Sequence, residues 1–180
     1  MFDVLDLYVP GKEFWNSELQ EFIYTKEITL HLKHSLVSLT RWEQHYKRRF
    51  LDDGPKNEEE YRFYIQCMTL NKDVDPLVYM VLQEDDMKKV TDYLHDSMTA
   101  TTLPKQNNNR TNSEKLSSEL IYYYMSALNI PFECEKWFLN NLITLISIAS
   151  IKNNPQEKKS KPSWSSIRAL NAARNAKARG

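Results

Sequence analysis

The spacing of apolar residues changes near Ser35, and this change constrains the fold more than any other feature. Before Ser35, apolar and polar residues alternate in Val4–Val9 and again within Glu21–Lys33. A period of two is typical of a half-buried strand, and Pro10-Gly11 separates the two stretches. The pattern predicts two strands and a small antiparallel sheet over residues 1–33.

After Ser35 the period is that of a helix. Leu39, Trp42, Tyr46 and Phe50 lie at i, i+3, i+7 and i+11, which predicts an amphipathic helix over residues 35–50. Three more helices are expected in the helical region, residues 34–96. They begin with a capping box from Asn57 to Glu60, with Asp75-Pro76, and near Asp85, where acids favour a helix start.

Residues 97–113 are polar, contain a proline and three consecutive asparagines, and predict a loop or linker. Residues 114–153 then predict an αα-hairpin core of two helices, Glu114–Leu128 and Glu133–Lys152. The second is apolar almost all round between Leu142 and Ala149, as expected of a central buried helix. A basic linker and a final helix over 163–178 complete residues 154–180. The chain is therefore predicted to be α+β and mostly α, with a small N-terminal antiparallel sheet, a helical bundle and a basic C-terminal helix.

The formal net charge of +0 hides a strong asymmetry. Residues 151–180 contain eight Lys and Arg against one Glu, which gives +7, and residues 1–150 contain 16 basic and 23 acidic residues, which gives −7. The final helix has a thin apolar stripe and a basic remainder, so three interpretations stay open: it binds an acidic partner, it lies on the chain's own acidic body, or it is simply solvated. The predicted partner-binding residues are Trp164, Ile167, Arg168, Leu170, Arg174, Lys177 and Arg179.

The sequence contains no recognisable motif for catalysis, nucleotide binding or metal binding. Three glycines in 180 residues form neither a P-loop nor a dinucleotide fingerprint, and no His, Cys and carboxylate cluster has metal-ligand spacing. Cys67 beside Met68 fits a reduced core residue better than a nucleophile. No apolar run approaches the roughly 18 residues of a membrane span, and no secretory signal is visible at Met1. We therefore expect no enzyme, cofactor, metal or membrane association.

Four blocks of the sequence resemble a family of tailed-bacteriophage proteins, the tail assembly chaperones. The blocks are 32–43 (LKHSLVSLTRWE), 98–102 (MTATT), 119–148 (ELIYYYMSALNIPFECEKWFLNNLITLISI) and 167–180 (IRALNAARNAKARG). The likeness spans most of the chain in the same order. Relatives tend to carry Trp at the position of Tyr124, and His and Arg at those of Phe138 and Asn141. If the family's polar side chains at the last two positions contact a partner, this chain lacks the groups for that contact.

This resemblance implies a non-enzymatic role in tail assembly without a cofactor. Such chaperones bind the tape-measure protein, a long helical rod that sets tail length, until tail-tube subunits polymerise around it. The resemblance also implies a location in the host-cell cytoplasm during assembly and absence from the finished virion. Whether the chain forms a homo-oligomer is left open by the sequence.

Two other functions compete with this one. The chain could be a permanent component of the virion, in the tail or at the head–tail joint. It could also be a small nucleic-acid-binding regulator that uses the basic tail together with Lys47-Arg48-Arg49, because phosphate neutralisation supplies affinity. Trp164 alone offers base stacking in the tail, so we rank nucleic acid below a protein partner.

Overall fold

The computed structural model describes residues 3–16, 20–51, 54–101 and 116–153. The chain divides into two compact units, Met1–Ile146 and Ser147–Gly180. The described strands and helices belong to the first unit, except that residues 147–153 of the last helix belong to the second. The predicted class is confirmed, since an N-terminal antiparallel sheet precedes a mostly helical part. The predicted C-terminal helix over 163–178 lies outside the described residues.

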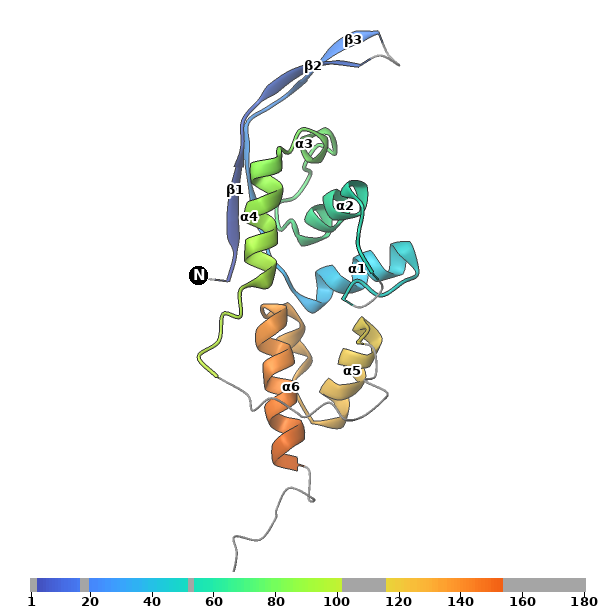
Figure 1. Ribbon diagram of the computed structural model, residues 1–180, viewed down its shortest axis with the longest axis vertical. Helices are drawn as coiled ribbons and strands as arrows, with labels where there is room; N and C mark the ends of the chain where they lie inside the picture. The colour runs from blue at the N-terminus through green and yellow to red at the C-terminus, as the bar shows by residue number, and fades with distance from the viewer. Residues whose placement is uncertain (1–2, 17–19, 52–53, 102–115, 154–180) are drawn as a thin grey trace, which may run out of the picture. The chain divides into compact units, whose positions relative to one another are not determined.

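The N-terminal strands form two successive antiparallel pairs, which we call the ribbon (Figure 1). Strand β1, Leu5–Val9, pairs with β4, Ile28–Leu32, and β2, Lys12–Asn16, pairs with β3, Glu21–Thr25. The sequence analysis did not predict β2, and it treated β3 and β4 as one stretch. The break falls opposite Pro10-Gly11, where a Cβ on Gly11 would lie 2.8 Å from the Thr25 carbonyl oxygen. Only glycine allows the two strands to approach so closely there.

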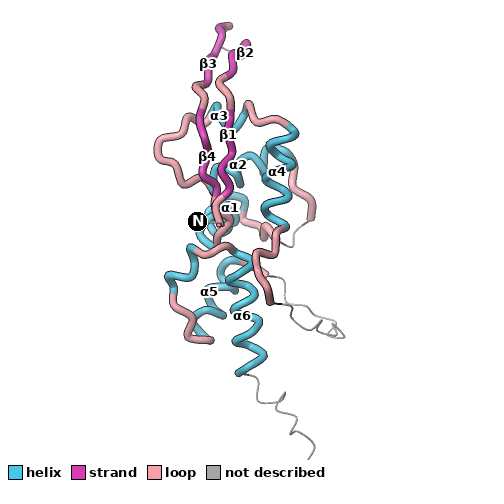
Figure 2. Tube along the Cα trace, turned by 90° about the vertical axis from the view of Figure 1, so that its left-hand side faces the viewer, coloured by secondary structure: helices cyan, strands magenta, loops and turns pink. Residues whose placement is uncertain are grey.

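One face of the β1–β4 pair contributes to the core. Leu7, Val9, Leu30 and Leu32 are almost fully buried, as their alternation predicts. Helix α2, Glu58–Met68, contacts β4, and helix α4, Glu84–His95, contacts β1. Figure 2 shows the strands with the helices beside them. We call β1 and β4 the backed half of the ribbon, and β2 and β3 the distal half.

Helix α1, Leu36–Tyr46, is shorter than the predicted 35–50. It begins with a capping box between Ser35 and Ser38, and it ends because Lys47 takes a left-handed conformation with φ 55°. Phe50 therefore lies beyond the helix, yet it stays in the core and stacks on Tyr64, with ring centroids 3.9 Å apart. The predicted Asn57–Glu60 capping box is present at the start of α2.

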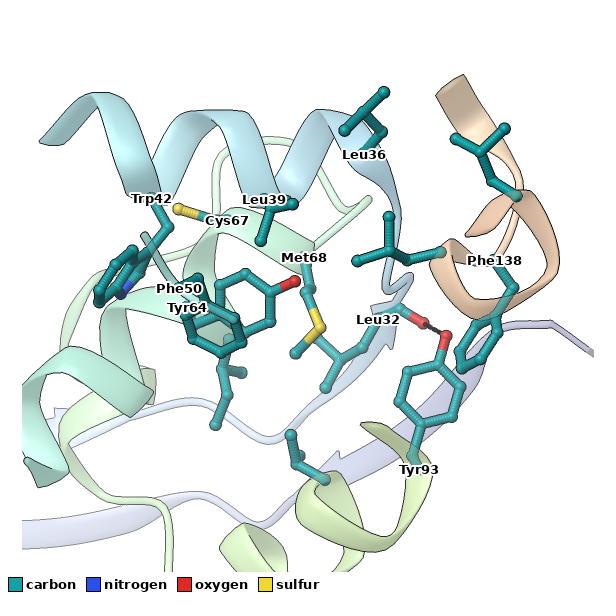
Figure 3. Close-up of a cluster of buried hydrophobic side chains, with 14 of the residues drawn as sticks. Leu32, Leu36, Leu39, Trp42, Phe50, Tyr64, Cys67, Met68, Tyr93 and Phe138 are labelled. Atoms are coloured by element: carbon teal, nitrogen blue, oxygen red, sulfur yellow. Dashed lines mark hydrogen bonds between the residues drawn. The ribbon is translucent and has the colours of Figure 1, made fainter. Parts of the chain in front are cut away.

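Figure 3 shows the buried rings of Trp42, Phe50 and Tyr64 between α1 and α2. Two polar contacts join the helices around this aromatic core. The buried Trp42 donates from Nε1 to the carbonyl oxygen of Glu60, 3.0 Å away, which joins α1 to α2. The buried Glu43 carboxylate accepts the backbone N–H groups of Phe50, at 3.0 Å, and Ser118, at 2.8 Å. Ser118 begins helix α5, Ser118–Ala127, so one carboxylate joins α1 to that helix. Because a buried carboxylate is costly without partners, these bonds fix its position.

The remaining helices differ from their predicted bounds. Helix α3, Leu77–Met80, is one short turn, and α4 agrees closely with the predicted start near Asp85. A 3₁₀ helix, Phe132–Lys136, follows α5, and α6, Leu139–Asn153, begins six residues later than predicted. The extended backbone of Trp137 separates the two, with ψ 163°. Within α6 only Leu139, Leu142 and Ile146 are buried, so the expected all-round burial is wrong and a single stripe faces the core.

Candidate interaction surfaces

The predicted partner-binding residues all lie outside the described residues. They are Trp164, Ile167, Arg168, Leu170, Arg174, Lys177 and Arg179. The candidate surfaces therefore consist of described residues that packing within the fold does not fully explain.

The ribbon carries four exposed aromatic side chains, and we call the three in its distal half, Trp15, Phe22 and Tyr24, the aromatic face. Tyr8, Trp15, Phe22 and Tyr24 have 56%, 54%, 55% and 67% of their surface exposed. Trp15 lies directly opposite Phe22 in the register of the distal half, and their rings meet edge to face with centroids 5.0 Å apart. Tyr24 lies two residues from Phe22 and so projects from the same side.

Acidic residues accompany these rings. The Tyr8 hydroxyl donates to Glu27 and the Tyr24 hydroxyl donates to Glu13, each over 2.8 Å. These hydrogen bonds to carboxylates raise the pKa of both tyrosines, because they stabilise the protonated hydroxyl. Both hydroxyls are thereby tied to carboxylates, while the two rings stay exposed. The aromatic face is thus both apolar and acidic.

Packing within the described residues does not account for the aromatic face. A folded chain gains little by exposing several large rings side by side, and contiguous apolar patches often mark interaction sites. A two-stranded hairpin is also marginal by itself, and these rings stabilise the distal half through the Trp15–Phe22 contact and the Tyr24–Glu13 hydrogen bond. The sequence analysis missed this surface, since it did not predict β2, and the register that brings Trp15 to Phe22 follows from that strand.

The basic cluster Lys47-Arg48-Arg49 serves the fold in part. Arg48 forms an ion pair with Glu60 at 2.5 Å, and its guanidinium lies 5.5 Å from the ring centroid of Trp42. Lys47 supplies the left-handed residue that ends α1. A hollow of about 470 Å³ beside the cluster is lined by the acids Glu43 and Glu119 as well as by these cations. This mixed charge suits a structural role better than a site for phosphates.

His34, which precedes the N-cap of α1, is buried, with 3% of its surface exposed. Its Nδ1 lies 2.7 Å from the Tyr64 hydroxyl, and its backbone N–H donates to the Tyr93 hydroxyl over 3.1 Å. The single hydroxyl proton of Tyr93 is in turn shared between the carbonyl oxygens of Asp3, 2.9 Å away, and Leu32, 3.3 Å away. Figure 3 shows the contact with Leu32. Burial lowers the pKa of His34 to about 4, so the ring is neutral at pH 7. This group links the ribbon to α2 and α4.

The thiol of Cys67 is also buried. Burial raises its pKa to about 11, which keeps the sulfur protonated and opposes a nucleophilic role. Among residues 3–16, 20–51, 54–101 and 116–153, no group of three His, Cys, Asp or Glu side chains is placed to hold a metal ion. No helix in the described part of the chain has the length and apolar character needed to cross a membrane.

Two residues at which this chain differs from the family it resembles, Phe138 and Asn141, lie beside the same hollow. Phe138 and Asn141 line a space of about 600 Å³ together with Asp3, Asp96, Met98 and Trp137. Phe138 is fully buried against His34 and Tyr93, with ring centroids 5.4 Å and 5.2 Å away. The side-chain oxygen of Asn141 is buried without a hydrogen-bond partner among the described residues.

The chain was compared with protein-family models, curated proteins and solved structures, and none of the three comparisons finds a match. The function is therefore argued from the residues and from the surfaces described above.

Proposed function

We propose that this protein is a non-enzymatic phage tail assembly chaperone that binds the tape-measure protein during virion assembly. The observation that carries the proposal is the likeness of residues 119–148 to that family. A tape-measure protein has long amphipathic helices that would aggregate before the tail tube covers them. A chaperone needs exposed apolar surface to shield such helices, and it needs no catalytic site.

The exposed part of that block supports a role at the surface. Tyr123, Phe132 and Trp137 belong to residues 119–148 and are largely exposed. Other members of the block, such as Ile121 and Met125, are fully buried and serve the core. Packing explains the buried residues, but it does not explain three large exposed aromatic side chains. Aromatic side chains of this kind are common anchors in protein interfaces.

In this proposal the body and the basic tail have separate tasks. The aromatic face, including Trp15 and Phe22, supplies apolar contact, while the stripe of Trp164, Ile167 and Leu170 with its basic neighbours holds an acidic or amphipathic helix. The tail's charge of +7 would speed the encounter and make it salt-dependent.

A charge-reversal experiment on the full-length chain tests the proposed arm. Arg174, Lys177 and Arg179 are changed together to Glu, and the variant is co-purified with the tape-measure protein of the same phage. We expect binding weaker by about tenfold or more, since a few rim contacts of this kind amount to about 1.4 kcal/mol. The matched control changes Lys158, Lys159 and Lys161 to Glu and should bind nearly as the parent does. An equal loss of affinity in both variants would show that only the overall charge of the tail matters. Unchanged binding in both variants would refute the role of the C-terminal helix in binding the tape-measure protein.

Mass spectrometry of purified particles separates the chaperone from a virion component. A chaperone is expected to be absent from finished phage, whereas a structural protein would be present at a fixed copy number. Detection at stoichiometric level would replace the present proposal with the virion alternative.

A further inference from the structure

A hollow of about 320 Å³ opens where the start of α1, the end of α2 and the 3₁₀ helix Phe132–Lys136 meet. Its floor is apolar and includes the partly exposed Val37, the buried Met68 and the exposed Leu70. Leu70 has 56% of its surface exposed, so part of this floor is open to solvent. Pockets for small ligands run from roughly 300 to 1,000 Å³, and this one stands at the small end. Its size suits one or two side chains of a partner.

Three cations and no acid line the hollow. Lys33 is paired with Asp3 at 2.7 Å. Within the described part of the chain, Arg41 makes one long hydrogen bond, 3.4 Å, to the carbonyl oxygen of Cys67, and its other guanidinium N–H groups bond to no described residue. Lys136 is exposed and makes no hydrogen bond or ion pair with another described residue. The rim is therefore basic, although residues 1–150 as a whole carry −7.

We propose that this hollow is a docking site for a peptide segment that presents a large apolar side chain with carboxylates beside it. The apolar side chain would cover Leu70 and Val37, and the carboxylates would meet Arg41 and Lys136. Arg41 can bind a carboxylate through two parallel N–H groups, which adds orientation to the attraction. The occupant is inferred from charge complementarity, because the local charge is opposite to that of the body around it. The site does not depend on the proposed assembly function.

The apolar floor distinguishes a peptide from a nucleic acid. A phosphate backbone would use the cations, but it would leave Val37, Met68 and Leu70 facing a charged chain. A peptide with alternating acidic and apolar side chains uses both parts of the hollow. Arg41, Cys67 and Lys136 come from three distant parts of the chain, so only the folded protein forms the site.

The test uses nuclear magnetic resonance on the full-length, isotope-labelled protein with two synthetic peptides. One is a short amphipathic helix with leucines flanked by glutamates, and the other carries glutamine at each glutamate. We expect the first to shift the amide signals of Ser35, Arg41, Leu70 and Lys136, and the second to bind about tenfold more weakly. Equal binding of the two peptides, or shifts confined to another surface, would overturn the proposal.

Variants locate the contact. The double variant Arg41→Glu with Lys136→Glu should lose at least about tenfold in affinity for the glutamate peptide. The matched control, Lys26→Glu with Lys88→Glu, makes the same charge change at two exposed positions outside the hollow and should bind as the parent does. If the Arg41 change prevents folding, Lys136→Glu alone, at an exposed side chain, should still weaken binding by about threefold. Full affinity in that variant, or displacement of the peptide by a short single-stranded oligonucleotide, would refute a peptide site.

Discussion

The two halves of the ribbon obey the same alternation and yet have opposite surroundings. In the backed half, Leu7 and Leu30 face each other across the strands and lie in the core. In the distal half, Trp15 and Phe22 face each other in the same way and lie in solvent. A period of two therefore determines which side chains share a face. Whether that face is buried depends on the helices that pack against it.

The edges of the two halves differ as well. Asn71 accepts the His31 N–H at 2.7 Å and donates to the Thr29 carbonyl at 3.0 Å, so the loop after α2 protects the outer edge of β4. In the distal half, the Lys12 ammonium donates to the Val81 carbonyl over 3.2 Å. Among residues 3–16, 20–51, 54–101 and 116–153, no backbone–backbone hydrogen bond joins β2 or β3 to an element outside the ribbon. An edge strand without such cover can pair with another chain.

The largest expected effect comes from removing core volume in the backed half. Leu30→Ala should lower the free energy of unfolding by about 2–5 kcal/mol, because Leu30 is fully buried and its loss leaves a cavity. Urea denaturation of parent and variant measures the difference. The control is Thr29→Ala on the exposed face of the same strand, with an expected cost below about 1 kcal/mol. Equal costs at both positions would show that the two faces do not differ as described.

The next effect is a pH dependence at the base of the backed half. The folded-state pKa of His34 is about 4, below its ordinary value of 6.5, so the unfolded chain binds more protons between these two values. The stabilisation is complete above pH 6.5 and is lost as the pH falls toward 4, by about 3 kcal/mol in total. Denaturation at a series of pH values should reveal this slope, and His34→Asn should flatten it. A parent protein equally stable at pH 7 and pH 4.5 would contradict the buried, neutral histidine.

The sequence predicted the strands of the backed half, but it predicted neither the distal strand β2 nor the exposed surfaces described above. Alternation gave β1 and β4, and the Asn57 capping box gave the start of α2, because both signals are local. Strand β2 was missed, since Lys12–Asn16 becomes a strand by pairing with β3 beyond a close approach at Gly11.

Long-range features had no sequence signal. His34 is buried because Tyr64 and Tyr93, far along the chain, close over it. The hollow beside Arg41 likewise needs Cys67 and Lys136 from two other elements. The helix predicted over 35–50 is too long, because Phe50 fits the helical spacing of apolar residues although the left-handed backbone of Lys47 ends the helix before it. The apolar spacing therefore predicted correctly that Phe50 is buried, but wrongly that it is helical.

The smallest effect on stability is expected at the aromatic face. Trp15→Ala should cost about 1 kcal/mol or less, because the ring is half exposed and its main contact is the edge of Phe22. A double-mutant cycle with Phe22→Ala should give a coupling of about 0.5–1 kcal/mol, measured by urea denaturation. In the proposed function, the same Trp15→Ala variant should lose more in affinity for the tape-measure protein than in stability. A cost near that of Leu30→Ala would instead place Trp15 in the core, and the distal half would then be part of the stable body rather than a surface kept for a partner.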